Sequence, residues 1–207
     1  MRSTAPCLLY EGAFGGPARI SAFLGNVRFL GKGDKNGSIE PEKDLLNVSK
    51  TDPAFPVYYH LFERGDFDEL YAIEEVCFAP PQRFTRRYMR DLIGSSDSAT
   101  WIAEERGRIV GFAILEWAQQ AAGVFAYIAT LEVLPAWRGR GIGAELLRRL
   151  EGSANAERAV AIWLHVDLEN AEAIRLYERL GYQSTGRADH YYARNRPAAI
   201  YSKSLTV

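Results

Sequence analysis

Residues 131–144, which read LEVLPAWRGRGIGA, constrain the fold more than any other stretch of the sequence. The residues just before them, 127–131, are mainly aromatic, aliphatic or β-branched, as a buried strand requires. Pro135 cannot donate to a strand ladder and therefore ends the strand. After Gly143, apolar residues recur at helical spacing and arginines fall on the solvent side. The stretch predicts a strand, a glycine-rich turn and a helix in immediate succession.

The turn between the strand and the helix has the features of an anion site. A helix start presents unpaired N–H groups and a partial positive charge, and the glycines at 139, 141 and 143 let the backbone approach an anion closely. Arg138 and Arg140 add positive charge beside it. The alternative is an ordinary tight turn whose glycines serve only packing, and the Lys-Ser/Thr ending of a P-loop is missing.

Two motifs together resemble those of a known family. Residues 138–143 have the form R-x-x-G-x-G, and residues 170–182 match N-x-x-A-x-x-x-Y-x-x-x-G-F, with Tyr182 at the last position. In this order they resemble the two signatures of the GCN5-related N-acetyltransferases, the GNAT superfamily. The resemblance covers about residues 56 to 207. It implies the α/β GNAT fold, a mixed, mostly antiparallel twisted sheet with splayed central parallel strands and about four helices.

The same resemblance implies acetyl-CoA as cosubstrate and indicates which residues hold it. Backbone groups of Leu131 and Val133 would hold the pantetheine arm, and the Val133 N–H would polarise the thioester oxygen. Asn170 lies where the family places an Asn against the pantetheine, although it could also serve simply as a helix N-cap. The pyrophosphate would lie on the backbone of Arg138, Gly139, Arg140, Gly141, Ile142, Gly143 and Ala144.

Three residues form the expected catalytic set. Tyr177 matches the family tyrosine near the sulfur, and an unperturbed tyrosine, with a pKa of about 10, stays protonated at neutral pH. His165 lies where N-terminal acetyltransferases of this type carry a Glu or His base, and an ordinary histidine pKa of about 6.5 suits that role. Tyr127 begins the cofactor strand, where several GNAT enzymes have a Glu or Tyr facing the site. Without the motifs, Tyr177 and His165 would be read as core residues.

Glu132 is a competing candidate for the base or for a contact with the acceptor amine. Strict alternation along a strand places it on the face opposite Tyr127. A β-bulge, which is common in this strand of the family, would change that parity, so the question stays open. Glu116 is a weaker candidate of the same kind.

The acceptor side resembles N-terminal protein acetyltransferases of the RimI type. The tyrosines Tyr191 and Tyr192 match a tract that lines the peptide cleft in those enzymes, and Phe78 and Pro80 match the loop on the opposite side. The chain departs from that pattern at Ala79 and at His190, which replaces an Asn. The expected acceptor is a protein N-terminal α-amine. A small-molecule amine acetyltransferase and a non-catalytic acetyl-CoA-binding module are the alternatives, and the tyrosines could simply pack a hairpin.

Composition excludes several other functions. A net charge of −1 argues against nucleic-acid or membrane-surface binding, and no apolar run reaches signal or transmembrane length. Cys7 and Cys77 fit neither a disulfide framework nor a metal site, and three histidines without clustered ligands make a metal site improbable. We therefore expect a cytoplasmic protein without a metal. The sequence does not reveal its oligomeric state.

The chain divides into an extension, residues 1–55, and the acetyltransferase domain, residues 56–207. Glycines and a polar stretch from 31 to 50 predict that the extension is flexible or loosely packed, with a possible hairpin near residues 20–30. In the domain, the first helix should turn Leu70, Ile73, Val76 and Cys77 inward, and Thr85 should cap the second. The patterns then predict strands at 99–103, 109–115, 124–134, 160–166, 182–188 and 198–205, after an edge strand at 57–61, and helices at 141–152 and 170–179.

Overall fold

The computed structural model describes residues 55–80, 82–193 and 196–205. The predictions for the N-terminal extension therefore lie outside the described residues, apart from Phe55. The helices and strands are β1 (Tyr58–Leu61), η1 (Arg64–Asp66), α1 (Phe67–Cys77), α2 (Arg86–Ile93), β2 (Ser98–Glu105), β3 (Arg108–Gln120), β4 (Gly123–Val133), η2 (Pro135–Trp137), α3 (Ile142–Ala156), β5 (Ala159–Asp167), α4 (Ala171–Arg179), β6 (Gln183–Ala193) and β7 (Arg196–Ser204).

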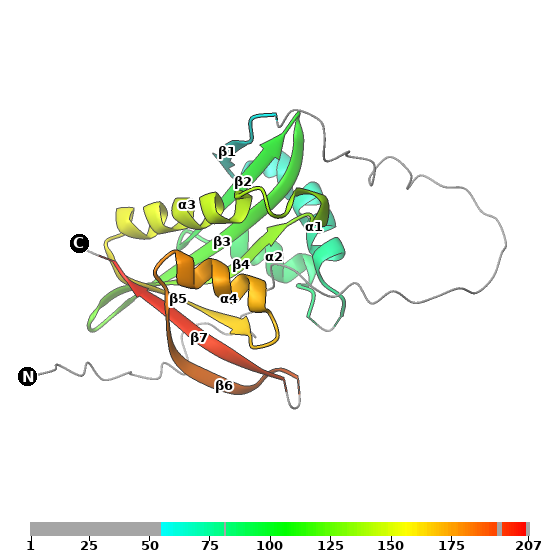
Figure 1. The fold of residues 1–207 in the computed structure, drawn as a ribbon. Helices are drawn as coiled ribbons and strands as arrows, with labels where there is room; N and C mark the ends of the chain where they lie inside the picture. Colours follow the sequence, from blue (N-terminus) through cyan, green and yellow to red (C-terminus); the bar gives the residue numbers. More distant parts are fainter. Residues whose placement is uncertain (1–54, 81, 194–195, 206–207) are drawn as a thin grey trace, which may run out of the picture.

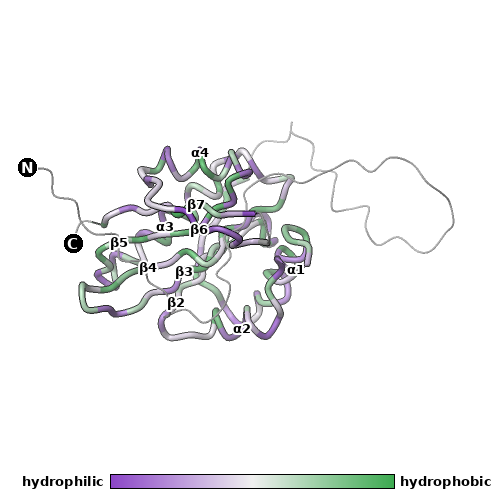
Figure 2. Tube along the Cα trace, turned by 90° about the horizontal axis from the view of Figure 1, so that it is seen from below, coloured by the Kyte–Doolittle hydropathy of each residue, from purple (hydrophilic) through white to green (hydrophobic). Residues whose placement is uncertain are grey.

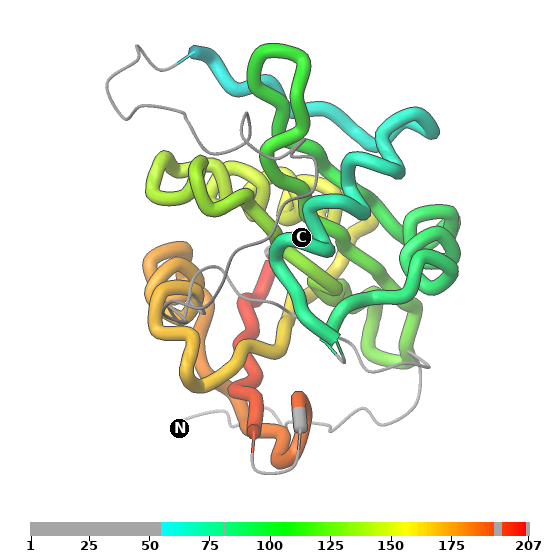
Figure 3. Tube along the Cα trace, turned by 90° about the vertical axis from the view of Figure 1, so that its right-hand side faces the viewer, coloured from blue at the N-terminus to red at the C-terminus, as the bar shows by residue number. Residues whose placement is uncertain are grey.

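The strands form one mixed sheet in the order β1-β2-β3-β4-β5-β7-β6. Only β4 and β5 pair in parallel, and every other pair of neighbours is antiparallel. Helices α3 and α4 cover one face of the sheet, and α1 and α2 lie against the other (Figures 1 and 3). The predicted α/β architecture, with its central parallel strands, is confirmed.

Local sequence signals set most of the element boundaries. The Thr85 side chain accepts a hydrogen bond from the Tyr88 amide and caps α2, as predicted, and the helix ends at Gly94. Arg106 and Gly107, the turn between β2 and β3, both have positive φ, which a tight hairpin turn requires. Figure 2 shows helices that change repeatedly between hydrophilic and hydrophobic residues along their turns, as helices with one buried face do.

The first helix buries most of the predicted face, including the partly buried Cys77, with one exception. Leu70 and Ile73 are buried as expected, but Val76 is 61% exposed. The buried stripe starts at Phe67 and continues through Tyr71 to Glu74, which follows helical spacing. The prediction for Val76 is wrong because it assumed that only apolar residues of this helix face the core. The polar residue Glu74 is buried instead, and Val76 faces solvent.

The third helix is longer than predicted and anchors the core. It continues to Ala156, and Leu146, Leu147 and Leu150 are completely buried against the sheet. It contacts four strands, β2, β3, β4 and β5. Because the glycine-rich turn leads directly into this helix, the packing of α3 fixes the position of the turn relative to β4.

Candidate active site

The central parallel strands separate part-way along their length. Pairing between β4 and β5 runs from Val124 to Tyr127 on β4 and ends at Trp163 on β5. Both strands continue, and residues 128–133 of β4 have no strand partner on the β5 side. Buried backbone groups need hydrogen-bond partners. Leu131 and Val133, the residues predicted to hold pantetheine, lie in this stretch and are buried. Its backbone groups are thus suited to a ligand that enters between the strands.

The glycine-rich turn has the conformation of an anion-binding loop. Gly139 and Gly141 have φ of +74° and +83°, and neither would bring a Cβ atom within 4 Å of another group. The glycines are therefore required by backbone conformation, and the space beside them is open. Gly141 caps α3, so that the amides of residues 142–144 have no acceptor within the helix. This arrangement fits a diphosphate.

The two arginines of the motif make contacts within the protein. Arg138 donates through Nε to the Val133 carbonyl at 2.9 Å. Arg140 forms an ion pair with Glu105, which also accepts a hydrogen bond from Trp137 Nε1 at 2.8 Å. The Arg140 guanidinium lowers the pKa of the Glu105 carboxyl. Contrary to the simplest expectation, the Arg140 charge is largely neutralised, and its main effect is to fix the turn.

Asn170 combines the two roles that the sequence left open. Its Oδ1 atom accepts a hydrogen bond from the Ala173 amide at 3.1 Å and caps α4. Its Nδ2 atom is buried and has no hydrogen-bond partner among the described residues. A buried amide donor without a partner is costly unless a ligand accepts from it. The cap is therefore shown, and the unused donor fits a pantetheine carbonyl.

A hydroxyl network connects β4, β5 and the β6–β7 hairpin. Tyr127 is completely buried, and its hydroxyl lies 3.3 Å from His165 Nδ1 and 3.2 Å from the Tyr191 hydroxyl. The Tyr191 ring stacks on the His165 ring with centroids 4.1 Å apart. Tyr192 packs edge-on against Tyr191. The structure thus brings together residues that are far apart in the sequence.

Burial shifts the pKa of His165 away from its ordinary value. It is 9% exposed and lies among the rings of Tyr127, Trp163 and Tyr191. Burial lowers its pKa to about 4. The imidazole is therefore neutral at neutral pH. The expected pKa near 6.5 is wrong because no carboxylate of the described residues compensates for the loss of water.

Tyr177 lies on α4 and keeps its proton. Its side chain is 1% exposed and packs edge-on against the ring of Tyr182. Burial raises its pKa well above 10. Tyr192 is close enough for the two hydroxyls to influence each other electrostatically. Tyr177 remains a proton donor across the physiological pH range.

The β6–β7 hairpin explains one departure from the family pattern. His190 has φ of +60°, in a segment where the pairing register between β6 and β7 shifts. Asn and, less often, His tolerate this left-handed conformation. Beyond the turn, Arg196 donates to Asp167 at 2.6 Å and lies over the Tyr192 ring. An Asn and a His can therefore fulfil the same backbone requirement ahead of the two tyrosines.

The loop between α1 and α2 is fixed at its end. The Tyr71 hydroxyl donates to the Phe84 carbonyl at 3.1 Å, and the Phe84 amide donates to Glu74 at 2.7 Å. Of the two residues predicted to line the acceptor cleft here, Phe78 is buried and Pro80 is exposed. Phe78 also accepts a hydrogen bond from Arg83 at 3.0 Å.

Glu132 lies in a different environment from the catalytic set. A register shift places an extra residue, Ala129, in β4, so that Glu132 and Tyr127 share one face of the sheet. However, the Glu132 carboxyl is enclosed against α1, where it accepts from Thr130 Oγ1 at 2.8 Å and contacts Glu74. Burial, with the neighbouring Glu74, raises its pKa well above 4.5. Glu132 thus belongs to the contact between α1 and β4 and not to the hydroxyl network.

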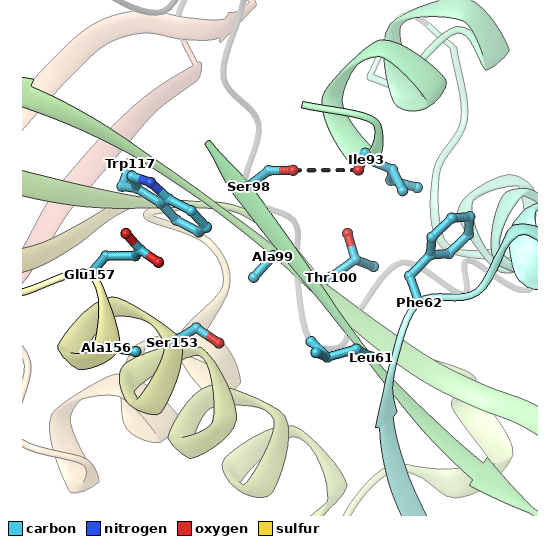
Figure 4. Close-up of a pocket in the computed structure, with 10 residues that line it drawn as sticks. All are labelled: Leu61, Phe62, Ile93, Ser98, Ala99, Thr100, Trp117, Ser153, Ala156 and Glu157. Atoms are coloured by element: carbon cyan, nitrogen blue, oxygen red, sulfur yellow. Dashed lines mark hydrogen bonds between the residues drawn. The ribbon is translucent and has the colours of Figure 1, made fainter. Parts of the chain in front are cut away.

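A pocket of about 360 Å³ lies elsewhere, at the edge formed by β1, β2 and the end of α3 (Figure 4). None of the residues predicted for the site lines it. Among the residues that the structure describes, no group of His, Cys, Asp and Glu side chains could hold a metal ion. No helix in this part of the chain is both long enough and apolar enough to span a membrane.

Comparison with known proteins decides the family. The model of the acetyltransferase (GNAT) family matches residues 67–182, which include β4, the glycine-rich turn and α4. The chain belongs to the GNAT family. It is therefore an acetyltransferase that transfers an acetyl group from acetyl-CoA to an amine.

Several GNAT relatives and solved structures are similar to the chain. It is 30% identical over 142 residues to the N-alpha-acetyltransferase RimI of Mycobacterium tuberculosis, covering 66% of this chain and 85% of that protein. An N-alpha-acetyltransferase of Sulfurisphaera tokodaii is 26% identical over 149 residues, covering 68% and 88%.

Among solved structures, Arabidopsis thaliana Naa50 in complex with the bisubstrate analogue CoA-Ac-MVNAL has a TM-score of 0.63 and 28% identity, covering 72% of this chain and 99% of that one. The ribosomal-protein-S18-alanine N-acetyltransferase from Escherichia coli has a TM-score of 0.65 at 22% identity, covering 73% and 96%, and shows the fold alone.

Three acidic residues hold segments of the candidate site in place and were missed in the sequence. Glu105 accepts a hydrogen bond from Trp137 next to the glycine-rich turn, and Glu74 accepts one from Phe84 in the loop between α1 and α2. Neither glutamate stands out from the other charged residues of the sequence. Asp167, the last residue of β5, forms an ion pair with Arg196 on the hairpin. Its position near Asn170 was the only signal for it in the sequence. Their partners are distant in sequence, which spacing cannot reveal.

We predict that Glu132→Gln makes the protein less sensitive to alkaline pH. The Glu132 carboxyl keeps its proton in the folded state above pH 4.5, whereas the unfolded chain releases it, so the wild-type protein loses stability as pH rises through this window. A glutamine amide can donate permanently to Glu74. Relative to wild type, the variant should gain more than about 1 kcal/mol in free energy of unfolding between pH 5 and pH 8.

Urea denaturation at both pH values measures the difference. The control is Glu169→Gln, which changes an exposed glutamate in the loop before α4. Parallel pH dependences for wild type and Glu132→Gln would contradict the assignment of a raised pKa to this carboxyl.

Proposed function

We propose that the chain acetylates protein N-terminal α-amines. The observation that supports this most directly is the contact of the Tyr127 hydroxyl with His165 and Tyr191 beside the point where β4 and β5 separate. It joins the middle of β4, the cofactor strand, to the tyrosines of the β6–β7 hairpin. Relatives that share this fold and sequence pattern are named N-alpha-acetyltransferases.

The chain offers a complete set of groups for acetyl-CoA. The unpaired edge of β4, including the backbone of Leu131 and Val133, would hold the pantetheine arm, with Asn170 Nδ2 as an additional donor. The amides of 142–144 and the turn before them would hold the diphosphate. Acetyl-CoA, when bound, supplies the thioester whose acetyl group is transferred.

A neutral hydrogen-bond relay manages the proton of the acceptor amine. An α-amine has a pKa of about 7.7–8.0, so a useful fraction is already neutral at pH 7.5. His165 Nε2 accepts the amine proton while Nδ1 passes its own proton to Tyr127, and Tyr127 passes its own to Tyr191. The half-buried Tyr191 releases its hydroxyl proton to solvent, so each group of the relay ends neutral. The relay produces no net charge on the imidazole, which agrees with its low pKa.

Tyr177 is the proposed general acid. Its raised pKa keeps the hydroxyl proton in place until a strong base, such as a leaving thiolate, develops beside it. Tyr177 lies on α4 about two turns after the Asn170 cap, so the same helix positions both residues.

A comparison of acceptors tests the proposed function. Purified protein with acetyl-CoA should acetylate the α-amine of short peptides, and mass spectrometry should place the acetyl group there. We expect kcat/KM for the best peptide to exceed that for free polyamines, free amino acids and aminoglycosides. Acetylation of one of these small amines, without acetylation of any peptide, would overturn the proposal and indicate a small-molecule acetyltransferase.

We predict that Tyr177→Phe lowers kcat by about 100-fold or more, the usual contribution of a positioned general acid. The dissociation constant for acetyl-CoA should change little, because the ring still fills its buried position. Tyr182→Phe is the matched control, since this buried tyrosine packs against Tyr177. An equal loss of kcat in the two variants would mean that Tyr177 acts through packing alone.

A further inference from the structure

Glu116 lies on the same face of the sheet as the hydroxyl network. On β3 it is paired with Tyr127 of β4 and, on its other side, with Ser98 of β2. Tyr127 is paired in turn with Trp163 of β5, two residues before His165. Residues directly opposite each other in neighbouring strands project to one face. The Glu116 carboxylate is therefore on the acceptor face, one strand away from Tyr127.

This carboxylate lacks a partner among the described residues. It is half-buried, and none of the described residues forms a hydrogen bond or ion pair with it. The hydroxyl of Ser98, its neighbour on β2, donates to the Leu92 carbonyl at 2.8 Å. Burial without a compensating cation raises the pKa of Glu116 to about 7. A carboxylate that is partly removed from water is costly unless something pairs with it.

The arginines of α2, the helix that packs against β2, contact other groups. Arg86 is paired with Asp68, and Arg87 with Asp91 at 3.8 Å. The guanidinium of Arg90 lies 4.5 Å from the centre of the Phe67 ring. The chain thus places an unpaired carboxyl group, ionised above about pH 7, beside its proposed acceptor site, while the arginines of α2 contact other groups.

We propose that Glu116 is a specificity-determining residue that pairs with a positive charge on the acceptor, so that the enzyme prefers peptides with Lys or Arg close to the reacting amine. This rests on the proposed function. Paired residues in adjacent antiparallel strands are separated by about 5 Å, and an extended peptide advances by about 3.4 Å per residue. A long basic side chain at the second or third position of an acceptor whose amine meets the Tyr127 network can therefore reach Glu116.

The test compares three peptides that differ only at positions two and three, which carry Lys, Gln or Glu. Wild-type protein should show a kcat/KM about tenfold higher for the Lys peptide than for the Gln peptide, as expected for a partly buried charge-assisted contact. Glu116→Gln should lose that preference, and Glu116→Lys should favour the Glu peptide. The matched control is Glu157→Gln, at the end of α3 on the opposite face, which should keep the wild-type order.

Two outcomes would overturn the role of Glu116. The Lys preference could persist in Glu116→Gln, or the three peptides could lose activity equally in Glu116→Gln and Glu116→Lys. If wild-type protein acetylates no peptide, the proposed function fails separately. The same variants are then compared on spermidine and on a monoamine. Loss of a spermidine preference in Glu116→Gln supports cation recognition by Glu116, and an unchanged preference overturns it.

Discussion

The structure depends on the loss of pairing between β4 and β5 beyond Tyr127 and Trp163. A parallel pair that continued would satisfy its own backbone and leave no entry between the strands. By separating, the strands expose the buried backbone edge of residues 128–133 to a ligand, and the same edge leads through a short turn to the start of α3. In the proposed binding mode, the pantetheine and diphosphate portions of acetyl-CoA therefore meet consecutive parts of one segment.

Burial keeps the proposed catalytic groups uncharged. It raises the pKa of Tyr127 and Tyr177 and lowers that of His165, so that all three are neutral at physiological pH. These three groups carry no charge that must be desolvated when the acceptor enters, and they favour the neutral form of the amine. The Glu132 carboxyl follows the same principle, because the proton that it keeps spares the contact between α1 and β4 a buried charge.

The sequence predicts well what depends on local signals. The turn at 138–143, the caps at Thr85 and Asn170 and the order of the elements are confirmed, because glycine conformation and side-chain capping act within a few residues. It fails where distant partners decide. The extra residue in β4 at Ala129 depends on the register with β3, and the neutral state of His165 depends on rings from β4 and the hairpin. Charge counting alone could not reveal that Glu105 neutralises Arg140.

Amide hydrogen exchange with and without acetyl-CoA tests the central claim most directly. The account predicts that acetyl-CoA slows exchange in two segments, residues 128–133 of β4 and residues 141–145 at the start of α3, while β1 at the far edge of the sheet is unchanged. Protection confined to other segments, such as the pocket between β1, β2 and α3, would contradict it. So would a complete absence of acetyl-CoA binding.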